Sequence, residues 1–166
     1  DGTFDYWEVR AGSEPAVESW AGNWCRVNLA GYTGMANLET IGGRIIEMHL
    51  RFADQWPDLY GIGWVEALVH LYENREWSYA DTDRRTGYSV VLFMPHGKHY
   101  RHPPLALVRQ IETMPGVSTV QITFHEKVAP ERHAMPPGGF RVAIVNCWDR
   151  AAGNDARSLL RIHFAR

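Results

Sequence analysis

The sequence lacks any long hydrophobic run, has only two cysteines and carries almost no net charge. No apolar stretch approaches the ~20 residues that a membrane-spanning helix needs, so we predict no membrane partner. With 17 basic and 19 acidic residues, the net charge of −2 argues against attraction of the whole surface to nucleic acid or to anionic membranes. Cys25 and Cys147 each lie in an apolar pattern, which favours buried thiols in a reducing compartment over a disulfide framework.

The chain also lacks the motifs that mark common catalytic sites. No serine lies in a strand–turn–helix elbow between two glycines. Both glycine pairs lead toward strand-like segments, so neither predicts a phosphate-binding loop before a helix. Carboxylates such as Asp54, Asp58 and Glu66 are interpreted as exposed groups, the usual state of acidic residues. We therefore predict a protein that is not an enzyme and that has no cofactor.

What the chain has instead is alternation of apolar and polar residues with a period of two. In residues 44–52 the two kinds of side chain would occupy opposite faces: Ile46, Met48, Leu50 and Phe52 against Glu47, His49 and Arg51. Successive strand side chains point to opposite faces, so this pattern predicts a strand with one dry and one solvated face. Eight segments are predicted to be strands: residues 4–9, 24–29, 44–52, 62–72, 88–94, 117–124, 140–148 and 159–164.

One segment has a convincing helical pattern. Residues 105–114 place Leu105, Val108 and Ile111 on a narrow apolar stripe and end at a Pro-Gly pair. A shorter helix could start at Ser13, which would cap it, with a proline in its first turn. The polar segments between the strands are interpreted as loops.

Eight strands and a short helix in a late crossover predict a mainly β protein. We expect a single domain over residues 1–166, built as an antiparallel β-sandwich that is jelly-roll-like. An α+β fold, in which residues 105–124 form a helix–strand unit, is the second interpretation.

A loop dense in histidine is the first candidate for chemistry. His96, His99 and His102 are spaced three apart and could converge on Zn²⁺ if the loop curls. No carboxylate or cysteine joins them at a familiar spacing. A solvated, partly basic loop is the interpretation that we favour, and a site for zinc or another borderline metal is the alternative.

The same region carries a candidate nucleic-acid surface. Lys98 and Arg101, together with Arg84 and Arg85 one loop earlier, could neutralise phosphates, and Tyr100 could stack on a base. Nearby aspartates offset the arginines, so a solvated loop is again the favoured alternative.

Seven tryptophans are many for a chain of this length. Most are expected in the core, as is usual for aromatic residues. Exposed ones would serve as anchors of a protein interface, and Trp56 and Trp77 are the candidates.

The order of segments resembles the viral jelly roll. The strand ending at Pro95, the helix after Pro104 and the run 136–148 are similar in pattern to capsid subunits of small RNA viruses. Residues 56–75, with glycines before the expected strand, also resemble tobamovirus-type movement proteins, although Glu73 stands where those proteins have Asp. The resemblance covers roughly residues 44–164, in pattern more than in identity. It implies self-assembly through sheet edges and loops, with RNA as a possible partner.

The sequence thus favours a non-enzymatic structural protein, a capsid-like subunit that forms a homo-oligomer. It would lie in a virion or the host cytoplasm if viral, and otherwise in the cytoplasm. Three alternatives stay open: a plant-virus-type movement protein, a soluble module such as a bacterial inhibitor or immunity protein, and a metal-dependent enzyme that uses the histidine loop.

Overall fold

The computed structural model describes residues 2–133 and 137–165. The chain, for which the sequence predicted one domain over residues 1–166, divides into two compact units. Unit 1 consists of residues 1–10 and 85–166, and unit 2 of residues 11–84.

Unit 1 is built on a four-stranded antiparallel sheet. Its strands, in spatial order, are β1 (Tyr6–Val9), β4 (Gly87–Met94), β6 (Phe140–Cys147) and β5 (Val117–Ile122). β4 and β5 both run antiparallel to β6, so they are parallel to each other. Parallel strands need a crossover connection, and α3 (Leu105–Glu112) supplies it.

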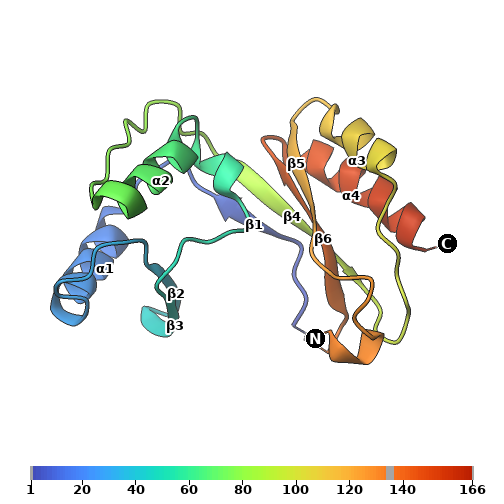
Figure 1. Cartoon of the computed structure of the whole chain (residues 1–166), viewed down its shortest axis with the longest axis horizontal. Helices are drawn as coiled ribbons and strands as arrows, with labels where there is room; N and C mark the ends of the chain where they lie inside the picture. The colour runs from blue at the N-terminus through green and yellow to red at the C-terminus, as the bar shows by residue number, and fades with distance from the viewer. Residues whose placement is uncertain (1, 134–136, 166) are drawn as a thin grey trace. The chain divides into compact units, whose positions relative to one another are not determined.

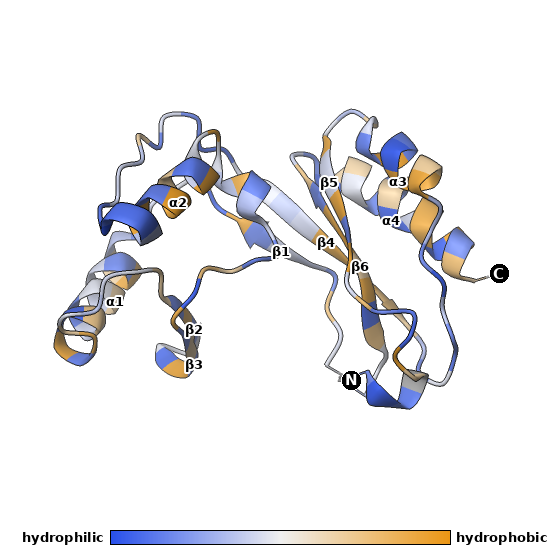
Figure 2. Cartoon of the chain, viewed as in Figure 1, coloured by the Kyte–Doolittle hydropathy of each residue, from blue (hydrophilic) through white to orange (hydrophobic). Residues whose placement is uncertain are grey.

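Two helices, α3 and α4 (Arg150–Phe164), pack on one face of this sheet (Figure 1). α4 turns Gly153, Ala156, Leu160 and Phe164 into the core, residues three and four positions apart that share one helix face. Figure 2 shows the matching hydrophobic run along β6, where Val142 to Val145 are fully buried. Burial on both faces explains why β6 reads as a nearly continuous apolar run.

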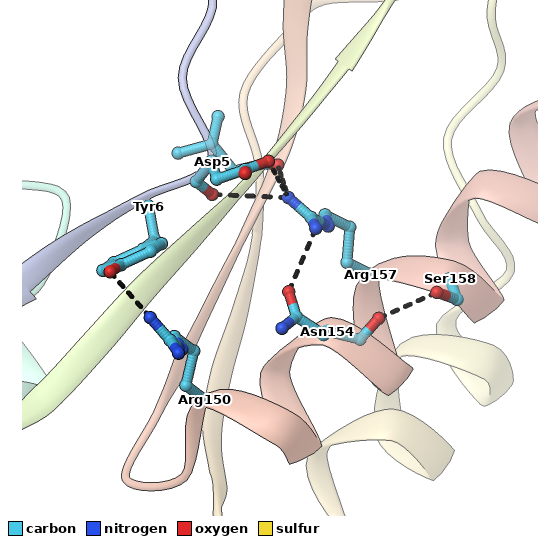
Figure 3. Close-up of polar contacts among 7 residues, drawn as sticks. Asp5, Tyr6, Arg150, Asn154, Arg157 and Ser158 are labelled. Atoms are coloured by element: carbon cyan, nitrogen blue, oxygen red, sulfur yellow. Dashed lines mark hydrogen bonds and ion pairs between the residues drawn. The ribbon is translucent and has the colours of Figure 1, made fainter.

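Polar contacts fasten β1 to α4 (Figure 3). The Arg157 guanidinium donates to the Asp5 carboxylate at 3.1 Å, and to the Val91 carbonyl at 3.3 Å. It also donates to the Asn154 amide oxygen at 3.0 Å. The Arg150 guanidinium donates to the Tyr6 hydroxyl of β1 at 2.7 Å. Because Arg157 is mostly buried and Asp5 directly precedes β1, the short edge strand is held by more than its ladder.

Unit 2 contains two α-helices and a hairpin. Its elements are α1 (Pro15–Asn28), β2 (Asn37–Ile41), β3 (Arg44–His49), the 3₁₀ helix η1 (Pro57–Tyr60) and α2 (Trp64–Asn74). A second 3₁₀ helix, η2 (Pro130–Arg132), lies in unit 1. Among the described helices, none is both long and apolar enough to cross a membrane.

Three predicted strands are wrong, because they lie in helices. Residues 24–29 end α1, residues 62–72 fall in α2, and residues 159–164 end α4. In α2 the expected strand face does not exist, since Ala67 and Leu71 are buried whereas Val65 and Val69 are 48% and 51% exposed. A short apolar run fits both periods, and only the wider spacing shows which one the chain uses.

Antiparallel pairing is confirmed, but the described residues form a mixed α/β structure. Five of the eight predicted strands are present in β1, β3, β4, β5 and β6. Helices pack on the four-stranded sheet of unit 1, and the second sheet has only two strands, so the jelly-roll-like β-sandwich is not confirmed by the described residues. The α+β interpretation of residues 105–124 is the closer one, as α3 leads directly into β5.

Details of the two predicted helices also differ. The stripe of α3 that packs on the core is Leu107 and Ile111, whereas Leu105 is exposed. α1 starts as expected at a proline, but Ser13 is not its N-cap. The Glu18 carboxylate accepts hydrogen bonds from the Glu14 backbone N–H and from the Ser13 hydroxyl, both at 2.9 Å, and these bonds lower the pKa of Glu18.

Candidate cation site on the β2–β3 hairpin

The predicted zinc ligands do not converge in the structure. The His102 ring nitrogen Nε2 lies 2.9 Å from the Phe124 carbonyl, and its backbone N–H donates to the Glu126 carboxylate. His96 lies beside the Phe140 ring, and His99 is exposed. Within residues 2–133 and 137–165, these three imidazoles belong to no group of three ligand atoms close enough to share an ion. In an irregular loop, residues that are three positions apart need not point their side chains in the same direction, and these histidines do not.

The predicted nucleic-acid residues are also dispersed. Tyr100 is 6% exposed, packs against Phe140 and donates its hydroxyl to the Pro95 carbonyl at 3.0 Å, so its ring is not free to stack on a base. The Arg85 guanidinium lies 3.9 Å from the Trp148 ring centroid. Arg84 pairs with Asp81 in unit 2. Lys98 and Arg101 are exposed in unit 1.

The two tryptophans predicted to contact a partner have different surroundings. Trp56 is half-buried and donates its indole N–H to the Tyr60 hydroxyl at 2.8 Å. Trp77 is 44% exposed and stands edge-on to Trp64, with 6.2 Å between the ring centroids. Only Trp77 therefore offers a large open aromatic surface.

The β2–β3 hairpin brings together potential metal-ligand side chains from two strands that are separate in the sequence. Gly42 and Gly43 form its turn with φ of +56° and +76°. A two-residue hairpin turn with positive φ at both positions is the type that matches strand twist, and glycine adopts it without a steric penalty. Ile41 and Arg44 therefore pair directly, and the register places Glu39 opposite Glu47.

Three side chains on one face of this hairpin form a compact group. The His49 imidazole Nε2 lies 3.0 Å from a Glu47 carboxylate oxygen and 4.0 Å from a Glu39 carboxylate oxygen. One ligand atom from each residue lies within 4.8 Å of the other two. His49 pairs with Asn37 across the hairpin, and the Asn37 amide donates to Glu39 at 3.4 Å. We call Glu39, Glu47 and His49 the hairpin triad.

The electrostatics of the hairpin triad favour a positive charge at its centre. Two carboxylates directly opposite each other on adjacent strands repel, which destabilises a pair of this kind. Both carboxylates are exposed and His49 is half-buried, so the group is open to solvent on one side. A divalent cation would neutralise the two negative charges and would keep positions free for other ligands.

The rest of the polar face predicted for residues 44–52 behaves differently. Arg51 lies beyond the end of β3, where its guanidinium donates to the Phe52 carbonyl at 2.9 Å and lies 3.6 Å from Asp54. On the face expected to be dry, Ile46 and Leu50 are exposed. The prediction of a dry face is therefore wrong for this segment in the part of the chain that the structure describes.

The alternating pattern predicts Glu47 and His49 on one strand face but does not include Glu39. A loop was predicted through Gly31, Gly34 and Asn37, and no strand was predicted before Gly42, although Leu38 and Ile41 flank polar residues. Two strand-like segments joined by Gly-Gly are a recognised hairpin pattern, and this pattern was the available signal. Comparison of the chain with protein-family models, with curated proteins and with solved structures gives no match.

Proposed function

We propose that the protein binds a divalent cation at the hairpin triad and uses it to hold a ligand that carries an oxyanion. The observation behind this proposal is the convergence of three potential ligand atoms from two strands within 4.8 Å. The ligands come from a rigid two-stranded element and not from a loop, which fixes their spacing.

The donor set indicates which ion to expect. Carboxylate oxygens suit Mg²⁺ and Mn²⁺, and an imidazole adds a nitrogen donor that Mn²⁺ accepts more readily than Mg²⁺ does. Octahedral ions with three protein ligands keep about three positions for water or for a bound oxyanion. This open coordination supports cation-dependent ligand binding rather than a closed structural site.

Titration with Mn²⁺, followed by the loss of the free-ion EPR signal, tests the proposal. We expect one Mn²⁺ per chain, released by EDTA. His49→Ala should weaken binding by about tenfold or more, equal to about 1.4 kcal/mol. A wild-type chain that leaves the Mn²⁺ signal unchanged, or a His49→Ala variant that binds as tightly, would contradict the proposal.

Self-association is the second candidate, and one observation favours it. The outer face of α2 exposes Val65, Val69 and Tyr72, which lie four and three positions apart on one stripe. Exposed apolar stripes mark protein contacts more often than isolated apolar residues do. Assembly of a capsid-like kind and contact with RNA remain predictions of the sequence pattern.

Light scattering coupled to size exclusion tests self-association. We expect the solution mass to rise above that of one 19.0 kDa chain as the concentration increases. Val69→Lys should shift the population toward the monomer, because it places a charge in the centre of the stripe. A constant monomer mass at every concentration would count against this candidate.

A further inference from the structure

Unit 2 contains a pocket of about 600 Å³ that the proposed cation site does not explain. It is lined by residues 32–37, by the pair Phe52 and Ala53, by Tyr60, by Trp64 and Leu71 of α2, and by Arg75, Trp77 and Arg84. Small-molecule sites commonly have volumes of about 300–1,000 Å³, with apolar walls and a few polar groups. The pocket has the size and composition of a site for a small organic molecule.

Aromatic rings form the floor and one wall of this pocket. Trp64 is only 7% exposed, and Tyr60 stacks on it with 4.3 Å between the ring centroids. The Phe52 ring packs against the same indole in an edge-to-face arrangement, with 5.7 Å between the ring centroids. Trp77 also lines the pocket, and its exposed ring is available to stack on a flat ligand. Planar rings prefer such offset or edge-to-face packing.

The phenols of the pocket carry no negative charge at neutral pH. Burial raises the pKa of Tyr60, against a smaller opposing effect of the hydrogen bond from Trp56. Removal from solvent also raises the pKa of Tyr32, whose hydroxyl donates to the Met35 carbonyl at 2.9 Å. The charge of the pocket is therefore set by its other side chains.

Those other side chains are cationic. Arg75 and Arg84 line the pocket, and no aspartate or glutamate does. Asp81 pairs with Arg84 at 3.3 Å, which offsets one of the two charges. Across the described residues, the Arg75 guanidinium has neither a hydrogen-bond nor an ion-pair partner. One arginine at the pocket is thus free to bind an anion.

Arg75, which lines the pocket, has an unusual backbone conformation. Arg75 has φ of +61° and Asp81 has φ of +49°, and no other non-glycine residue of the described chain has a positive φ. Arg75 is the C-cap of α2, a position that glycine normally fills at no cost. A non-glycine residue in this region carries a modest energetic cost, and Arg75 bears it at a position that lines the pocket.

We propose that this pocket binds a planar aromatic ring that carries a carboxylate, with the ring against Trp77 and the carboxylate on Arg75. A guanidinium matches a carboxylate with two parallel hydrogen bonds, which gives both charge and direction. The buried indole of Trp64 provides the apolar floor. This site does not depend on the cation, because its charge comes from arginine.

Calorimetric titration with naphthalene-2-carboxylate in EDTA tests the proposal. We expect saturable binding of one molecule per chain, and at least about tenfold weaker binding of the neutral naphthalene-2-methanol. Arg75→Gln should raise the dissociation constant of the acid by about tenfold or more. Trp77→Ala should also weaken it, because the ring proposed to stack on the ligand is removed. Arg44→Gln, an exposed arginine on β3, is the matched control and should bind like the wild type.

The outcomes separate this site from the hairpin triad. Equal affinity for the acid and the alcohol, or an unchanged affinity in Arg75→Gln, would overturn the proposal. So would binding of the acid only when Mn²⁺ is present, because the cation would then hold the carboxylate. Loss of Mn²⁺ binding in His49→Ala with normal binding of naphthalene-2-carboxylate would support two separate sites.

Discussion

Glu47→Gln is expected to lower the affinity for Mn²⁺ by at least about tenfold, equal to about 1.4 kcal/mol. The substitution keeps the size of the side chain but removes one of the two negative charges that hold the ion, and affinity for hard cations follows ligand charge. The metal-free variant should be at least as stable as the wild type, because the repulsion between Glu47 and the opposite Glu39 is gone. EPR titration and urea unfolding measure the two effects.

The same pair of measurements distinguishes a cation site from a group of exposed acids. Saturating Mn²⁺ at about 100 times its dissociation constant should stabilise the wild type by about 2.7 kcal/mol, and Glu47→Gln should lose most of this gain. Glu73→Gln, an exposed glutamate on α2, removes the same charge outside the triad and should behave like the wild type. Equal loss in both variants would mean that the effect is one of net charge.

The sequence predicted the strands of unit 1 better than the helices at either end of the chain. β4 and β6 were found because each contains a continuous apolar run, residues 90–94 and 142–145, close to turn residues. α4 was missed because Leu160, Ile162 and Phe164 alternate in a short window, while its true face also needs Gly153 and Ala156. Because Gly153 and Ala156 are only weakly hydrophobic, the 3.6-residue periodicity of the α4 sequence is weak, although this face of α4 packs closely on the sheet.

The hairpin triad was missed for a different reason. Glu39 and Glu47 are eight positions apart, and nothing in that separation shows that they are neighbours. Their proximity depends on the Gly42–Gly43 turn and on the register that it sets. The register shifts between Glu39 and Thr40, so even a correct hairpin would have to include this irregularity. Site geometry of this kind follows from strand pairing and not from motif spacing.

Gly153→Ala should destabilise the protein by about 1–3 kcal/mol, the usual cost of forcing a group into a packed core. In an exposed helix the same change is stabilising, because alanine is the better helix former by roughly 1 kcal/mol. Here α4 lies so close to the sheet that an added Cβ would meet the Cys147 sulfur and would lie 2.8 Å from a Val90 methyl group. Both neighbours belong to the buried core of unit 1, so neither can move aside cheaply.

Gly22→Ala is the matched control, because Gly22 lies inside α1 and an added Cβ would meet nothing within 4 Å. Its free energy of unfolding should rise by up to about 1 kcal/mol. Thermal or urea unfolding of the two variants gives opposite signs if close packing decides the effect of the first. The double variant Gly153→Ala with Val90→Ala should recover part of the loss, since it removes one of the two contacts. A stabilised Gly153→Ala variant would show that α4 does not pack on the sheet as closely as described.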